Sequence, residues 1–319
     1  MEPSVRSDAN GDFSLIATQE DFSIIATTDQ TTVDTSSGVV LDGVTLKAPL
    51  ASTMLTPATT LMEEGNLTAS QVVQVLGLPD AIDPLTFDAF EDGVDTNQAL
   101  AVEKASHQIM TVINAFAAAA EGAGASQADS FEVALNSVVQ VMKSRVGSNL
   151  TINLTNTDDL ADIKTQVTTD VVSVANVDTD AFGAMADDTT TAIMNVNVKI
   201  NEVTDIGTVV AKNVFSTAQV LNIQIKNGVA AEVAAVGTGT INFIEASAVE
   251  AAATNLAPTD ITITLPSLAI ISNPEISEDA DSLLVGTLGA VDDDQAAGVA
   301  HTYAIVGSSD TDSASFNIN

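Results

Sequence analysis

Apolar residues return every three or four positions through the middle of the chain. One stripe contains Val102, Ile109, Phe116 and Ala120, and a second contains Phe131, Leu135, Val138, Met142 and Val146. Side chains at this spacing share one face of a helix, so each stripe predicts an amphipathic helix whose apolar face is buried. Similar stripes run over residues 160–174, 182–200 and 206–225. We therefore expect roughly six helices between residues 55 and 235.

Local signals place some of the helix ends. Thr68-Ala-Ser-Gln71 has the form of a capping box, which begins a helix. Gly122-Ala-Gly124 separates the first two long stripes, so the helices on either side are expected to fold back on each other as a hairpin. Thr and Val are weak helix formers and are frequent in the later stripes, so those helices should depend on tertiary packing more than on propensity. We expect the Met and Phe residues on the stripes to belong to the core.

The first 50 residues follow a different pattern, in which Thr, Val, Ile and Asp alternate around turn signals. Asn10-Gly11 and Asp42-Gly43 are typical of hairpin turns, so we expect short strands here. Asp12-Phe-Ser-Leu-Ile-Ala-Thr18 is nearly repeated as Asp21-Phe-Ser-Ile-Ile-Ala-Thr27, which indicates either two similar strands in one sheet or a chance duplication. We divide this part of the chain into a small β module over residues 1–50 and a mainly α-helical domain over residues 51–254.

The charge balance excludes several classes of partner. The chain has 43 acids and nine bases, which gives a formal net charge of -34. Such a field repels the phosphates of nucleic acids and anionic lipid headgroups, and it attracts divalent cations. We expect no nucleic-acid partner, and no membrane insertion either, because no stretch reaches the roughly 18 apolar residues of a membrane span. The chain has no Cys, which removes thiol nucleophiles and zinc-thiolate sites.

Candidate catalytic residues are few. His107 is expected on a helix and His301 at the start of a strand, and neither has a neighbouring nucleophile in the sequence. Acid pairs such as Glu63-Glu64 arise by chance in so acidic a chain, and an aromatic content of 3% supplies few rings for a glycosidase cleft. There is no phosphate-binding loop and no dinucleotide fingerprint. We predict that the chain is not an enzyme.

The composition changes again near Ala257-Pro258. Lys226 is the last basic residue, so the acids that follow have no compensating cation in the sequence. Ile261-Thr-Ile-Thr-Leu265 alternates as a strand does, and the runs over 282–288 and 301–306 predict further strands. A segment with so many uncompensated carboxylates favours a bound metal ion.

Five motifs occur in order in this last segment: Asn255-Leu-Ala-Pro-Thr-Asp-Ile261, Pro274-Glu-Ile-Ser-Glu-Asp279, Val285-Gly-Thr-Leu-Gly-Ala-Val-Asp-Asp-Asp294, His301-Thr-Tyr303 and Ser315-Phe-Asn-Ile318. At these residues the chain resembles the cadherin-like repeats of large bacterial surface proteins and adhesins. The resemblance implies a Greek-key β-sandwich, here incomplete over residues 255–319, and calcium at the junction of consecutive repeats. It also implies four metal ligands, which are Asn255, Glu278, Asp292 and Asp294.

Coordination chemistry agrees with a calcium site at these residues. Calcium takes six to eight oxygen ligands, and an Asp-x-Asp pair on an extended loop brings two carboxylates to one point. Without the ion, two carboxylates about 4 Å apart repel each other by on the order of 4 kcal/mol at an effective dielectric near 20. The alternative is that Asp292-Asp-Asp294 is a solvated turn and Glu278 a surface acid. Asp293 departs from the family pattern, in which Pro is frequent, and we expect further strands beyond Asn319 to complete the repeat.

The front of the chain carries a second resemblance. Ser7-Asp-Ala-Asn-Gly-Asp-Phe-Ser14 resembles the strand-turn-strand of carboxypeptidase-regulatory-like β modules in exported proteins. The stretch from Leu46 to Leu61, followed by Val75-Leu-Gly-Leu-Pro79, is similar to a helical segment found between such modules and repeat arrays. Neither resemblance implies a catalytic residue.

These features predict an α+β multidomain chain with a small β module, a mainly α-helical middle domain and an incomplete Greek-key β-sandwich. We expect a non-enzymatic, calcium-stiffened segment of an extracellular adhesin or stalk on a bacterial cell surface. Its expected partners are calcium ions, adjacent repeats of the same chain and an unidentified surface target. Two alternatives are a helical module that binds a ligand in a groove and a self-assembling subunit of a surface layer or filament.

Overall fold

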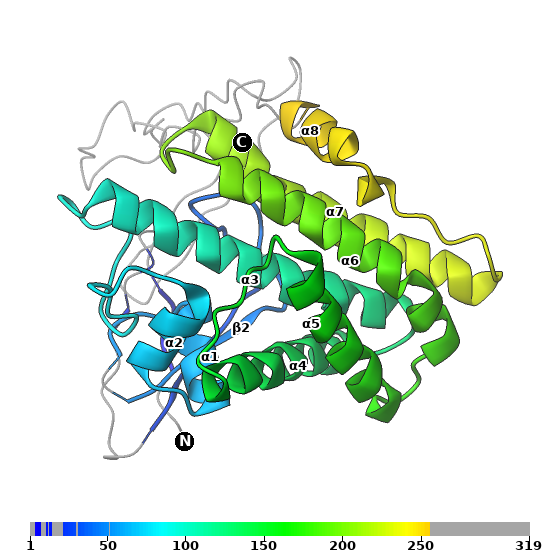
Figure 1. The fold of residues 1–319 in the computed structure, drawn as a ribbon, viewed down its shortest axis with the longest axis horizontal. Coiled ribbons are helices and arrows are strands. Elements are labelled where there is room, and N and C mark those ends of the chain that lie inside the picture. Colours follow the sequence, from blue (N-terminus) through cyan, green and yellow to red (C-terminus); the bar gives the residue numbers. More distant parts are fainter. Residues whose placement is uncertain are drawn as a thin grey trace, which may run out of the picture. The chain divides into compact units, whose positions relative to one another are not determined.

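A computed structural model describes residues 4–7, 11, 13–14, 22–29, 31–50 and 52–255 (Figure 1). Within these ranges the chain forms two strands and eight α-helices. The strands are β1 (Ile24–Thr27) and β2 (Thr45–Ala48). The helices are α1 (Pro57–Gly65), α2 (Ala69–Leu76), α3 (Thr96–Gly122), α4 (Gln127–Gly147), α5 (Thr157–Asp170), α6 (Thr179–Glu202), α7 (Val209–Ala234) and α8 (Ala246–Asn255), with short 3-10 turns η1 (Val171–Ser173) and η2 (Asn242–Ile244).

Polar side chains fix where the helices begin. Each of the first seven helices follows a residue whose side chain accepts a hydrogen bond from a backbone N–H of the first turn; these residues are Thr56, Thr68, Asp95, Ser126, Asn156, Asp178 and Thr208. Such a cap contributes about 1 kcal/mol to helix stability. The predicted capping box is confirmed, because Gln71 also accepts a hydrogen bond from the Thr68 N–H, at 2.9 Å.

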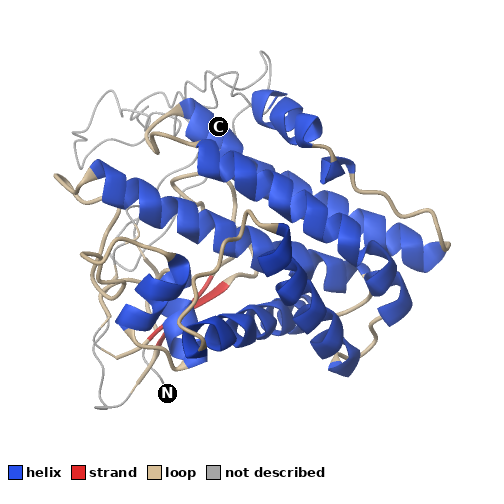
Figure 2. Ribbon diagram, in the orientation of Figure 1, coloured by secondary structure: helices blue, strands red, loops and turns tan. Residues whose placement is uncertain are grey.

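Helix α3 is the centre of the bundle (Figure 2). It packs against α4, α6 and α7, while α5 packs on α4 and α6, and α8 packs on α6 and α7. Residues 123–126 join α3 to α4, so the predicted helical hairpin is confirmed, and α3 ends at Gly122 where the sequence places the break. Among the described residues, no helix is long and apolar enough to span a membrane.

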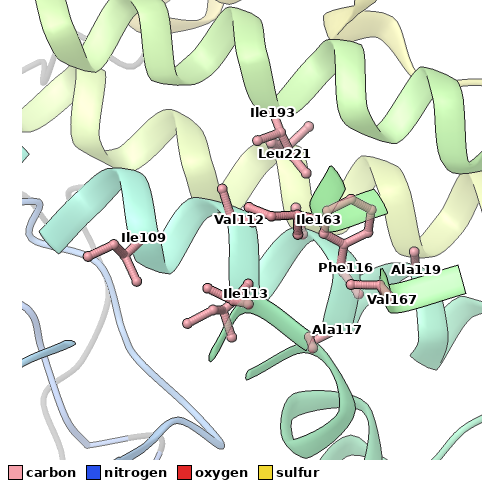
Figure 3. Packing of buried hydrophobic residues seen from close by; sticks show 14 of the residues in the cluster. Ile109, Val112, Ile113, Phe116, Ala117, Ala119, Ile163, Val167, Ile193 and Leu221 are labelled. Carbon is pink, nitrogen blue, oxygen red and sulfur yellow. The ribbon is translucent and has the colours of Figure 1, made fainter. Parts of the chain in front are cut away.

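Side chains from α3, α5, α6 and α7 meet in one core (Figure 3). Phe116 of α3 is fully buried, and Ile163, Ile193 and Leu221 reach the same cluster from the other three helices. Burial of such a side chain contributes roughly 1.5–3 kcal/mol relative to its exposure to water. The prediction that Met and Phe on the stripes form core is confirmed for Phe116 and also for Met142, which is fully buried on α4.

Small residues let α3 and α7 approach closely. Ala117 to Ala120 are all buried, so α3 is apolar on every side over this stretch, as expected of a helix enclosed by others. A Cβ atom at Gly122 would lie 2.4 Å from the backbone oxygen of Lys226. Only glycine therefore fits at the point where the end of α3 passes the backbone of α7.

The two strands pair in antiparallel register, with Ile24 opposite Ala48 and Thr27 opposite Thr45. The hairpin packs on α1, where the Thr60 hydroxyl accepts a hydrogen bond from the Lys47 N–H at 2.9 Å. Between the strands, residues 28–29 and 31–44 belong to a long loop, in which Val33 and Val40 form a bridge. We call this segment the β1–β2 loop.

The described residues confirm a mainly helical fold with a small β region, and they differ from the prediction in detail. Helices α1 and α8 lie outside the five long apolar stripes, and the fifth stripe is wrong at Val210, which is 69% exposed in the first turn of α7. The stripe over 160–174 ends in the 3-10 turn η1 because α5 stops at Asp170. The incomplete β-sandwich lies outside the described residues, and the domain boundaries stay predictions.

Candidate functional site

A cavity of about 260 Å³ lies between the β1–β2 loop and helices α3 and α7. The loop lines it with residues between 34 and 44, α3 with Met110 and Asn114, and α7 with Phe215 and Asn222. Side chains at the start of α4 complete the wall. We call this space the α3–α7 cavity. Because its walls come from four separate segments, it exists only when the loop is held against the helices.

A cluster of polar side chains holds the loop in that position. The Oγ of Ser36 lies 2.6 Å from Nε2 of His107 and 2.9 and 3.0 Å from the two carboxylate oxygens of Asp34. The ring of His107 stacks on Phe215, with 3.8 Å between ring centroids and 9° between planes. The cluster therefore joins the loop, α3 and α7 through residues up to 181 positions apart, from Asp34 to Phe215.

The Asp34 carboxylate organises the tip of the loop. It accepts hydrogen bonds from the backbone N–H groups of Ser36 and Ser37 and from both of their hydroxyls. A carboxylate is a stronger acceptor than an imidazole nitrogen, so we assign the Ser36 proton to Asp34 and the shared His107 proton to Nε2. Nε2–H then donates to the Ser36 oxygen.

Burial perturbs the two titratable groups that α3 contributes. The pKa of Glu103 is raised from 4.5 to about 7, chiefly because the carboxyl is removed from water and secondly because Asp34 is negative. The pKa of His107 is lowered because burial disfavours the imidazolium, although Asp34 opposes the shift. The Oε2 of Glu103 lies 3.8 Å from Nε2 of His107. At neutral pH the imidazole is therefore uncharged, while Glu103 is present in both its protonated and its ionised form.

The cluster fits an anchoring role better than nucleophilic chemistry. A catalytic serine needs an open approach for its substrate and a carboxylate that orients the far nitrogen of the histidine. Ser36 is only 3% exposed, and Asp34 contacts Ser36 on the same side of the ring, 4.0 Å from Nε2. The geometry therefore fastens the β1–β2 loop to α3.

The rest of the cavity wall is rich in carboxamides. Asn114, Gln219 and Asn222 all line it, and the Oδ1 atom of Asn222 is shielded from solvent without a hydrogen-bond partner among the described residues. Lys226 and Glu121 lie at the cavity edge and form an ion pair with each other. The wall thus combines neutral hydrogen-bonding groups with the acids Asp34 and Asp42 and with the ion pair of Lys226 and Glu121.

A second cavity, of about 230 Å³, lies between the end of α2, the middle of α3 and residues 151–154. Gln108 of α3 lines it, and the side chain of Gln108 donates a hydrogen bond to the backbone oxygen of Asn197 on α6. Asn153 also lines it, and its Oδ1 accepts a hydrogen bond from the Thr155 N–H at 3.0 Å, so both carboxamides of this cavity already have partners.

The structure places one of the four predicted calcium ligands. Asn255 is the last residue of α8, whereas Glu278, Asp292 and Asp294 lie outside the described residues. Within the described ranges, no group of three or more His, Asp or Glu side chains is arranged to hold a metal ion. Three carboxylates and an amide oxygen are donors that calcium accepts, so the predicted set is chemically suitable.

Comparison with known protein families, curated proteins and solved structures finds no match to this chain.

Sequence reasoning missed the cluster around His107. It correctly expected His107 on a helix, but it found no neighbouring nucleophile, and Ser36 lies 71 positions away in the chain. The local signal that was present is Asp34-Thr-Ser-Ser37, whose spacing is typical of a side chain that accepts hydrogen bonds from the residues two and three positions later. That signal predicts the turn but not its contact with α3.

Proposed function

We propose that the chain is a non-enzymatic segment of an extracellular stalk or adhesin on a bacterial cell surface, stiffened by calcium. The observation that carries the proposal is the Asp292-Asp-Asp294 motif in a segment without any Lys or Arg after Lys226. Asn255 and Glu278 would complete the ligand set. An ion held by these groups would neutralise their repulsion and restrain the segments that carry them.

The charges of the helical unit are consistent with an environment that attracts divalent cations. All nine Lys and Arg residues belong to the described part of the chain, and six of them form ion pairs with carboxylates there. The 43 acids therefore far exceed the bases that could neutralise them. Such a surface raises the local concentration of cations, so the experiment must separate a specific calcium site from diffuse attraction.

Calcium titration of the full chain by calorimetry makes that separation. We expect saturable binding that is lost in the double variant Asp292→Asn and Asp294→Asn. A matched control replaces Asp187 and Asp188, adjacent acids on α6, by Asn and should keep the binding. At about 100 times its dissociation constant, one calcium ion stabilises the state that binds it by about 2.7 kcal/mol. Equal calcium binding by both double variants would show diffuse attraction only and would end the proposal.

A second candidate function is a helical ligand-binding module, and the α3–α7 cavity favours it. Ligand sites are typically concave, mostly apolar and equipped with a few convergent polar groups. The cavity combines Met110 and Phe131 with the carboxamides of Asn114 and Asn222. Stabilisation of the full chain by a small molecule, lost when the cavity is filled by a larger side chain at Ala118, would support this module. If the chain is instead a filament subunit, size-exclusion chromatography of the full chain would show polymers.

A further inference from the structure

We infer that the β1–β2 loop is a cover that opens the α3–α7 cavity while the helices stay folded, and that ionisation of Glu103 promotes the opening. Neither calcium nor a ligand is needed for this motion, so it goes beyond both proposed functions. Two features lead to it: the loop forms its backbone hydrogen bonds with itself, and the cluster that fastens it to α3 brings two carboxylates to one imidazole.

The backbone hydrogen bonds of the β1–β2 loop join one part of the loop to another. The Asp34 N–H donates to the Val39 oxygen at 2.9 Å, and the Gly38 N–H donates to the Asp34 oxygen at 2.7 Å. Nearer the base, the Leu41 N–H donates to the Thr32 oxygen at 2.8 Å. Among the described residues, these bonds of the loop backbone all stay within the loop. The loop can therefore move away from the helices as a unit, without the loss of backbone hydrogen bonds.

Few polar contacts hold the loop against the helices. The Oγ of Ser36 lies 2.6 Å from Nε2 of His107, which is the contact at the tip. The side chain of Gln127 on α4 donates to the Asp42 oxygen at 3.4 Å, a long hydrogen bond. Val40 lines the cavity but is 42% exposed, so it adds little apolar anchoring. The cluster around His107 is therefore the main attachment of the loop tip.

The charges around that attachment are mostly negative. The Oδ2 of Asp34 lies 4.0 Å and the Oε2 of Glu103 lies 3.8 Å from Nε2 of His107. Asp88, in the segment before α3, is a third acid near Glu103, whereas α7 places the uncharged ring of Phe215 against the imidazole. In the described ranges, the ion pairs of Lys and Arg involve other acids. Once Glu103 is ionised, it and Asp34 repel each other across a neutral imidazole.

Opening of the loop relieves this repulsion and returns Glu103 to water. Burial and the charge of Asp34 raise the pKa of Glu103 from 4.5 to about 7, and both causes end when the loop leaves α3. A full return to 4.5 favours the open state by up to about 300-fold at about pH 8 and by about fourfold at about pH 5. His107 has the opposite dependence, because its lowered pKa favours opening as the pH falls below about 6.5. The effect of Glu103 is therefore measured against Glu103→Gln at the same pH.

Thiol labelling of single-cysteine variants measures the opening, because the chain has no Cys of its own. Ala118 lines the cavity and Ala186 on α6 does not, although both are 6% exposed. The reagent is dithiobis(nitrobenzoate), and each rate is divided by that of the same variant unfolded in urea at the same pH. We expect Ala118→Cys to react at least about tenfold faster than Ala186→Cys at about pH 8. Addition of Glu103→Gln to Ala118→Cys should slow the reaction by about 10- to 300-fold at about pH 8 and by at most about fourfold at about pH 5.

Two controls accompany the labelling. Glu132→Gln, at an exposed position on α4, should leave the rate unchanged, and Ala117→Cys repeats the measurement from a second position in the cavity wall. Circular dichroism verifies that each variant is folded. If Ala118→Cys and Ala186→Cys react equally fast, the cavity opens only when the helices unfold, and the inference is wrong. It is also wrong if Glu103→Gln slows labelling by the same factor at both pH values, or not at all. Because calcium and ligands are left out of the assay, neither outcome decides between the proposed functions.

Discussion

Replacement of Glu103 by Gln should stabilise the protein strongly above neutral pH and only slightly at acid pH. The side chain of Glu103 on α3 is 13% exposed, and burial together with the nearby negative charge of Asp34 raises the pKa of its carboxyl from 4.5 to about 7. An acid whose pKa is higher in the folded state than in the unfolded state binds protons more tightly when the protein is folded. Its contribution to stability is therefore greatest at low pH and is lost as the pH rises from about 4.5 through about 7.

The size of the effect follows from the shift in pKa. A shift from 4.5 to about 7 at 1.36 kcal/mol for each unit gives a cost of roughly 3 kcal/mol at about pH 8 and below roughly 1 kcal/mol at about pH 5. Gln has nearly the same shape and never ionises, so Glu103→Gln removes this cost. In a chain of this size about 1 kcal/mol moves the melting temperature by roughly 2–4 °C, so we expect a rise of roughly 6–12 °C at about pH 8.

Urea unfolding followed by far-ultraviolet circular dichroism is the suitable assay, because the fold is helical and the chain has no Trp and one Tyr. His107 has the opposite dependence, since its lowered pKa reduces stability as the pH falls below about 6.5, but it is present in both proteins. Glu132→Gln, at an exposed position on α4, is the control and should change stability little at either pH. A gain that is equal at both pH values, or none at about pH 8, would refute the reasoning.

Three further substitutions test the packing and the anchor. Ser36→Ala should cost about 1–2 kcal/mol in the free energy of urea unfolding, because it leaves Nε2 of His107 and the Asp34 carboxylate without their shared partner; an unchanged midpoint would contradict the anchor. Asn195→Ala should cost about 1–3 kcal/mol and speed hydrogen exchange near η2, since the Asn195 amide donates to the backbone oxygens of Phe243 and Ile244. Phe116→Ala should cost about 3–5 kcal/mol, as expected for a fully buried aromatic ring, and a loss below about 1 kcal/mol would argue against the central place of α3.

The helices were predictable because their apolar spacing is local information. The stripes through Phe116 and Met142 identified α3 and α4, and the glycine break between them identified the turn. Helix α8 could not be found this way, since its ten residues are too few for several repeats of the pattern. Val210 shows the limit of periodicity: it lies on the predicted stripe, yet it is exposed, and the residue buried in the first turn of α7 is its neighbour Ala211.

The candidate site was not predictable because it is built from long-range contacts. Ser36 and His107 are separated by 71 positions, and nothing local to either residue indicates the other. Asn222 is an ordinary polar residue on a helix by its local sequence, and only the folded chain places it in the wall of the α3–α7 cavity. Periodicity assigns a residue to a face of its helix, but it does not say which distant loop will cover that face.

Several of the few basic residues pair with carboxylates at places where two helices meet. Arg145 of α4 pairs with Asp159 and Asp162 around the start of α5, Lys164 of α5 with Asp187 of α6, and Lys226 of α7 with Glu121 of α3. Each exposed pair contributes only about 0–1 kcal/mol, so the pairs do not account for stability by their number. Their placement matters more: they neutralise carboxylates where two helices meet, and the acids left unpaired repel one another at the surface. Calcium or another cation would then act chiefly on those unpaired acids and leave the helical core unchanged. The stability of the helices alone therefore does not test a specific calcium site, and the test has to change Asp292 and Asp294.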